Sequence, residues 1–129
     1  MDRYTDELNK ASHALVEAQS RVLSINAAVL AVEKDLAILK AVEANLLENI
    51  RVMKSRLPIV LANEFRKALK DLDTCKSRMA FLRIDLDNNC RIQRNTIAEY
   101  DKIKTKYDAA YACVHNPPNN VIHFRKRDG

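Results

Sequence analysis

Glycine and proline are almost missing from this chain of 129 residues. The one glycine is Gly129, the last residue, and the three prolines are Pro58, Pro117 and Pro118. Glycine and proline supply most turns in ordinary globular proteins, so a chain this poor in both is expected to have few turns. A glycine-rich phosphate-binding loop is also excluded, because no glycine precedes position 129.

A targeting segment, a membrane span and a disulfide framework are lacking as well. The N-terminal sequence MDRYTDELNK is polar where a signal peptide would be basic and then apolar. The most apolar stretch, 27–47, is interrupted by five charged residues, which excludes a membrane span. The three cysteines, Cys75, Cys90 and Cys113, are odd in number and widely spaced, which favours free thiols over a disulfide framework. We therefore expect an intracellular protein, in a reducing cytoplasm or nucleus or inside a virus particle.

Helix-forming and charged residues make up most of what is present. Apolar residues account for 47% of the chain and charged ones for 30%, a composition typical of long helices and coiled coils. The net charge of +5 lies in the second half: residues 1–57 carry eight basic and eight acidic side chains, and residues 58–129 carry fourteen and nine. An anionic partner would therefore be expected to meet the second half.

Apolar residues recur every seven positions through the first half of the chain, in two rows three residues apart. The rows are Leu8, Leu15, Val22, Val29, Leu36, Glu43, Ile50 and Leu57, and Ala11, Ala18, Ile25, Val32, Leu39, Leu46 and Met53. Fourteen of these fifteen positions are apolar, and Glu43 is the exception. Three or four heptads are usually enough to indicate a coiled coil, so this pattern predicts one long helix with a continuous seam.

The same pattern resumes after Pro58, from Phe65 and Leu61 to Val114. If the chain folds back near 58–60, residues whose numbers total about 118 face each other, which places Leu36 opposite Leu82 and Ala11 opposite Tyr107. Such layers have the matched volumes that close packing requires. The predicted fold is an all-α antiparallel helical hairpin over residues 1–116. The alternative is one long helix that Pro58 only kinks.

Polar residues disturb the seam in two places. Asn89, Gln93 and Thr96 fall in the seam rows of the second arm, opposite apolar residues of the first. We expect the arm to bend, stutter or break there. Glu43 lies in the seam beside Cys75, where a polar residue that sets the register or sits at the edge is expected.

Apolar surface outside the seam predicts contact with other protein chains. A single seam cannot cover the apolar residues of 27–47, and large exposed apolar patches usually mark interfaces. The predicted interface residues are Leu30, Ile38 and Leu47 on the first helix, and Pro58, Ile59, Val60 and Leu61 at the turn, where loops are normally polar.

The last residues form a basic tail of a different character. Pro117 and Pro118 end the second arm, so residues 117–129 are predicted to be a separate extended segment. Its interface residues are predicted to be Val121, Ile122 and Phe124, which alternate as a strand does and could add to the sheet edge or groove of a partner. Contact with an anion is assigned to Arg125, Lys126 and Arg127. The alternative is a solvated chain end.

Catalysis and metal binding find little support in the residue pattern. Cys113, His115 and His123 could gather around zinc only if the tail folded back, and their spacing is not a recognised ligand pattern. A coiled coil offers no enclosed pocket from which water is excluded. We therefore expect no metal, no cofactor, no small-molecule substrate and no enzymatic activity.

Two functions remain after these exclusions. The first is a structural or assembly role, as a coiled-coil subunit of a homo- or hetero-oligomeric complex such as a virion or phage particle. The alternative is a small basic helical protein with a nucleic-acid-binding or regulatory role. High salt separates the two, because it weakens phosphate contacts steeply and leaves apolar association in place.

Overall fold

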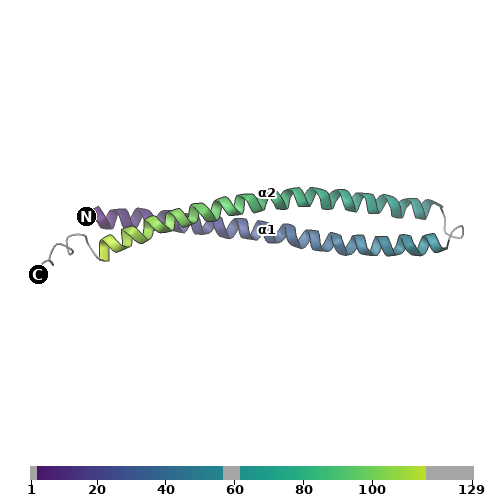
Figure 1. The fold of residues 1–129 in the computed structure, drawn as a ribbon, viewed down its shortest axis with the longest axis horizontal. Coiled ribbons are helices and arrows are strands. Elements are labelled where there is room, and N and C mark those ends of the chain that lie inside the picture. The colour runs from purple at the N-terminus through teal and green to yellow at the C-terminus, as the bar shows by residue number, and fades with distance from the viewer. Residues whose placement is uncertain (1–2, 57–61, 116–129) are drawn as a thin grey trace, which may run out of the picture. The chain divides into compact units, whose positions relative to one another are not determined.

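The computed structural model describes residues 3–56 and 62–115, which form two helices. Helix α1 spans Arg3–Ser55 and helix α2 spans Ala62–His115 (Figure 1). The two helices run antiparallel and pack against each other, so the predicted all-α hairpin is confirmed and the alternative of one long kinked helix is wrong. The predicted turn and tail residues lie outside the described residues.

The ends of both helices carry the charges that helix dipoles favour. Asp6 lies in the first turn of α1 and Lys54 in its last turn. Glu64 lies in the first turn of α2 and His115 in its last. Acidic groups near the N-terminus and basic groups near the C-terminus stabilise the partial charges there.

The hairpin divides into two compact units, each made of one segment of α1 and one of α2. Unit 1 comprises residues 1–26 and 92–129, and unit 2 comprises residues 27–91. Every described position of the two heptad rows is buried or half-buried, in both helices and both units. The seam is therefore where the heptad pattern predicts it.

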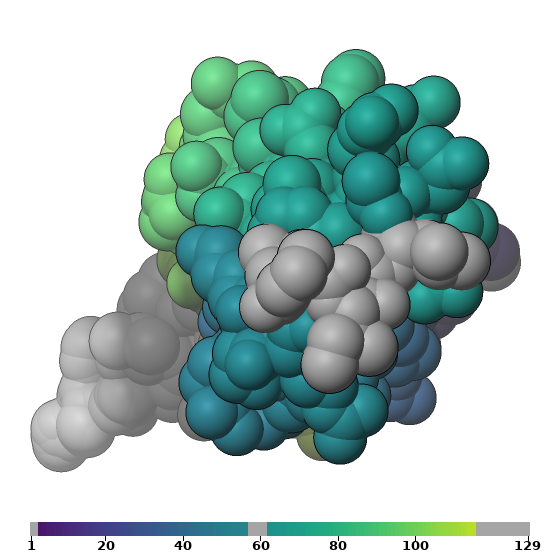
Figure 2. Space-filling model, turned by 90° about the vertical axis from the view of Figure 1, so that its right-hand side faces the viewer, coloured from purple at the N-terminus to yellow at the C-terminus, as the bar shows by residue number. Residues whose placement is uncertain are grey.

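Unit 2 contains the main core. Leu36, Cys75 and Met79 are buried together, and Met79 is only 1% exposed. The half-buried residues packed around them are Val32, Leu39, Leu46, Leu82 and Leu86. The Cys75 thiol donates a hydrogen bond to the carbonyl oxygen of Leu39, at 3.4 Å. Figure 2 shows the end of this unit, where α1 ends and α2 begins, with the two helix segments lying against each other.

The register of unit 2 agrees closely with the predicted one. A groove of about 280 Å³ is lined by Leu46, Asn49 and Met53 from α1, and by Glu64, Lys67, Ala68 and Asp71 from α2. The sequence places Leu46 opposite Leu72 and Met53 opposite Phe65, next to the α2 residues that line this groove. The lining therefore agrees with the predicted register.

The polar stretch of α2 begins with Asn89 in unit 2 and continues with Gln93 and Thr96 in unit 1. The helix continues through residues 88–96, so the arm does not break there. Asn89, Gln93 and Thr96 are all half-buried, and the Gln93 side-chain amide donates a 2.7 Å hydrogen bond to Asn26 Oδ1. The polar seam residue thus meets a polar residue beside the seam of α1, and this satisfies part of its hydrogen-bonding capacity.

Candidate interaction surfaces

An apolar surface covers the side of α1 in unit 2 that points away from the seam. We call it the α1 outer face and define it as Ala27, Leu30, Ala31, Lys34, Ala37, Ile38, Ala41, Ala44, Asn45 and Glu48. All ten residues are exposed, and the largest apolar side chains among them, Leu30 and Ile38, are 52% and 62% exposed. Spacings of three, four and seven residues place them on one side of an α-helix.

The three predicted interface residues of α1 do not form a single patch. Leu30 and Ile38 belong to the α1 outer face, whereas Leu47 follows the seam residue Leu46 directly. At about 100° per residue, Leu47 lies roughly 120° around the helix from Ala41. Leu47 is 46% exposed and therefore borders the seam on another side of α1.

A second apolar surface, not anticipated from the sequence, lies on α2 of unit 2. Phe81 is 73% exposed and Ile84 is 60% exposed. Phe81 also lines a shallow groove of about 290 Å³ together with Ser77, Arg78 and Leu82. The heptad pattern could have indicated this exposure. Phe81 and Ile84 each come two positions after a seam residue and so cannot point into the seam.

Unit 1 carries its own exposed apolar side chains on both helices. On α1 these are Val16 and Leu23, which are 60% and 69% exposed. On α2 they are Ile92, Ile97 and Tyr111, which are 40% to 47% exposed. The rings of Tyr111 and His115 lie with their centroids 3.9 Å apart near the end of α2.

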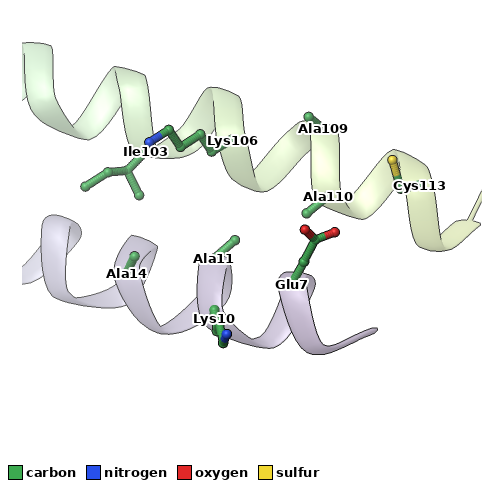
Figure 3. A pocket seen from close by; sticks show the side chains of 9 residues that line it. All are labelled: Glu7, Lys10, Ala11, Ala14, Ile103, Lys106, Ala109, Ala110 and Cys113. Atoms are coloured by element: carbon green, nitrogen blue, oxygen red, sulfur yellow. The ribbon is translucent and has the colours of Figure 1, made fainter. Parts of the chain in front are cut away.

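A groove of unit 1 measures about 550 Å³ and runs between the two helices (Figure 3). Small side chains leave this space open: Ala11 and Ala14 point toward α2, and Ala110 points toward α1. Glu7 directs its carboxylate toward α2 at one end, and Lys10 points away. The remaining lining residues are Ile103, Lys106, Ala109 and Cys113. The lining is thus mostly apolar, with the Glu7 carboxylate, two lysines and the Cys113 thiol as its polar groups.

Charged side chains pair along the helices. The four ion pairs among the described residues join exposed side chains three or four residues apart: Arg3–Glu7, Glu48–Arg51, Lys67–Asp71 and Lys104–Asp108. The shortest, between Arg51 Nη2 and Glu48 Oε2, measures 2.6 Å. The hydrogen bond and charge of Arg51 lower the pKa of the Glu48 carboxyl below its usual 4.5, and Glu48 in turn raises the pKa of Arg51.

Several predicted site residues lie outside the described residues and stay predictions. They are the turn residues Pro58, Ile59, Val60 and Leu61, the tail residues Val121, Ile122 and Phe124, and the basic cluster Arg125, Lys126 and Arg127. His123, the third member of the zinc arrangement considered above, is outside as well.

Within residues 3–56 and 62–115, no three His, Cys, Asp or Glu side chains gather closely enough to hold a metal ion. Neither described helix is long and apolar enough in any stretch to cross a membrane. Comparison of the chain with protein-family models, with curated proteins and with solved structures finds no match.

Proposed function

We propose that the chain is a non-catalytic assembly protein, a helical subunit that joins a larger protein complex through the outer surfaces of its hairpin. One observation carries the proposal. Among the described residues, twelve large hydrophobic side chains are exposed, whereas seven hydrophobic residues are buried. The described hairpin therefore exposes more large hydrophobic residues than the number of hydrophobic residues it buries completely.

The distribution of these side chains supports assembly more than their number does. Single exposed apolar residues are common on any protein, but Leu30 and Ile38 lie among five exposed alanines on one helix face. Burying a leucine or isoleucine side chain fully contributes about 1.5 to 3 kcal/mol. Contact with another chain would recover this free energy, which the isolated hairpin leaves unused.

The remaining features of the described residues agree with a binding role. The grooves between and beside the helices are open and mostly apolar, and the ion pairs are exposed and local. Cys75, Cys90 and Cys113 are free, which supports a reducing compartment. A place in a particle such as a virion is one assembly of this kind.

The test is the apparent mass of the chain in extract of its native source, measured at low and high salt and after nuclease treatment. We expect a mass well above 14.7 kDa that persists in high salt, because apolar burial is insensitive to screening. A mass that falls to the monomer after nuclease treatment or in high salt would instead identify a nucleic-acid binder.

A surface variant and a matched control make the test specific. Leu30→Glu, Ile38→Glu and Phe81→Glu add three charges to the apolar surfaces, and the control Gln19→Glu, Ser24→Glu and Thr74→Glu adds three at exposed polar positions. We expect the first variant to elute as a smaller species and the control to elute as wild type. Equal elution of both variants with wild type would refute the proposal.

A further inference from the structure

We infer that the α1 outer face binds a second copy of this chain, with the two α1 helices antiparallel and crossing at Ala41. The inference rests on the proposed assembly function and names one partner for it. It concerns unit 2 alone, since all ten residues of the face belong to residues 27–91.

The charges of the face select an antiparallel pairing. Only two members of the face are charged, Lys34 and Glu48, and each lies seven residues, or about two helical turns, from Ala41. In an antiparallel pair centred on Ala41, Lys34 of each copy meets Glu48 of the other. In a parallel pair, lysine would face lysine and glutamate would face glutamate, and like-charge contacts are unfavourable.

The sizes of the side chains match in the same register. Ile38 and Ala44 each lie three residues from Ala41, on opposite sides, so the bulky side chain of one copy meets the small one of the other. Ala41 meets its own counterpart at the two-fold axis. Alanine at the crossing lets two helices approach to the short end of the usual 8 to 10 Å range, which brings the protruding Ile38 side chain of each copy against Ala44 of the other.

The arrangement is isologous, as most homodimer interfaces are. In this register residues 34–48 of the two copies face each other, about 22 Å of helix, and the two-fold axis makes each contact away from Ala41 occur twice. Arg51, which holds the Glu48 carboxylate at 2.6 Å, lies at the edge of the face and leaves the carboxylate able to accept a further bond from Lys34 of the second copy.

Sedimentation equilibrium of the purified full chain tests the pairing. We expect a dimer whose dissociation constant rises at least about tenfold in Ile38→Glu, since a buried charge replaces apolar contact. The exposed charge of Lys40 lies off the face, so Lys40→Glu should leave dimerisation unchanged. Circular dichroism checks that each variant keeps its helices.

A charge exchange tests the register. Lys34→Glu alone should weaken the dimer about threefold or more, because two glutamates then face two others. Lys34→Glu combined with Glu48→Lys and Arg51→Glu should restore the wild-type constant to within about twofold, since the contact between copies and the pair of positions 48 and 51 are both rebuilt with their signs exchanged. Failure of this triple variant to recover would overturn the proposed register.

Crosslinking with a short bis-maleimide tests the axis in a chain whose native cysteines are replaced. Ala41→Cys should link two copies, and Ala31→Cys, on the same face but ten residues from the axis, should not. Linking at both positions would show a parallel pair and overturn the inference.

The failure of this inference is distinguishable from failure of the proposed function. A chain that is monomeric when purified but enters a large, salt-resistant complex in native extract would overturn the second copy and keep the assembly role. If Phe81→Glu dissociates the dimer and Ile38→Glu does not, the interface lies on α2. That result would likewise overturn the inference.

Discussion

Units 1 and 2 have the same heptad pattern but pack differently. In unit 2, six hydrophobic residues are buried: Val29, Leu36, Ile50, Ala68, Cys75 and Met79. In the described part of unit 1, residues 3–26 and 92–115, Ala18 alone is buried. A regular pattern of apolar residues therefore determines which side of a helix faces its partner. The volume of those residues determines how completely the contact excludes water.

Side-chain size and polarity explain the contrast. Unit 2 places leucines and Met79 around the sulfur of Cys75, which fills the space between the helices. Unit 1 brings Ala11 and Ala14 toward Ala110, and these short side chains leave a groove between the helices. Unit 1 also includes the hydrogen-bonded pair Gln93 and Asn26, which contributes less than close apolar packing would.

Truncating a core side chain in unit 2 should have the largest effect. Met79→Ala is expected to reduce the free energy of unfolding by about 2 to 5 kcal/mol, because it leaves a cavity in a filled core. Ile103→Ala in unit 1 should cost only about 1 to 2 kcal/mol, since Ile103 already borders an open groove. Urea denaturation followed by circular dichroism measures both.

The exposed Ile84→Ala is the control for this pair and should change the free energy of unfolding by less than about 0.5 kcal/mol. Equal losses for Met79→Ala and Ile103→Ala would show that the two units are packed equally well, and the contrast between them would be lost.

Filling the groove of unit 1 should narrow the difference between the units. Ala14→Leu adds three carbons that can cover Ala110 and Ile103, and we expect a gain of about 1 kcal/mol in the free energy of unfolding. Ala112→Leu, on the exposed surface of the same unit, serves as the control and should give no gain. A loss of stability in Ala14→Leu would mean that the groove is narrower than its lining indicates.

Sequence reasoning predicted the hairpin and its register because both depend on periodicity, which local sequence contains. The seam rows are buried or half-buried where predicted, and Leu46 shares a groove with Ala68 and Asp71, which come shortly before its predicted counterpart Leu72. The groove was not predicted: Tyr107 was expected to fill the space opposite Ala11, but it does not line the groove, and its ring lies 6.2 Å from that of Tyr111.

Contacts made by residues beside the seam were also missed. Gln93 was expected to face an apolar residue, and it reaches Asn26 instead, one position along. The exposure of Phe81 was not predicted, because the heptad pattern identifies the residues of the seam and not those that lie outside it. Such contacts depend on the direction and length of the side chains, and a heptad pattern gives no information about either.

Removing the hydrogen bond of unit 1 should have a smaller effect. Gln93→Leu and Asn26→Leu each leave one partner unpaired, and we expect each to cost about 0.5 to 1 kcal/mol. The double variant should be near wild type or slightly more stable, because no polar group is then left without its partner. Additive single effects in this double-mutant cycle would show that the bond contributes nothing.

The smallest effect is expected from Glu48 in unit 2. Its pKa lies below the usual 4.5 because Arg51 donates to it, so its contribution is present above pH 4.5 and is lost as the pH falls through the lowered value. Titration followed by NMR should show the low pKa in wild type and a return toward 4.5 in Arg51→Ala. Since both side chains are exposed, unfolding curves of the two proteins should nearly coincide. An unshifted Glu48 in wild type would refute the ion pair.

The difference in burial between two of the native thiols allows the opening of the helices to be measured by chemical labelling. Cys75 is 5% exposed in unit 2, whereas Cys113 is half-buried beside the groove of unit 1. An alkylating reagent can reach Cys75 only during the moments when the helices of unit 2 separate, so its labelling rate counts those events. Cys75 thus reports the opening of unit 2 in one chain and without any added probe, and Cys113 gives the labelling rate of a thiol that is already within reach.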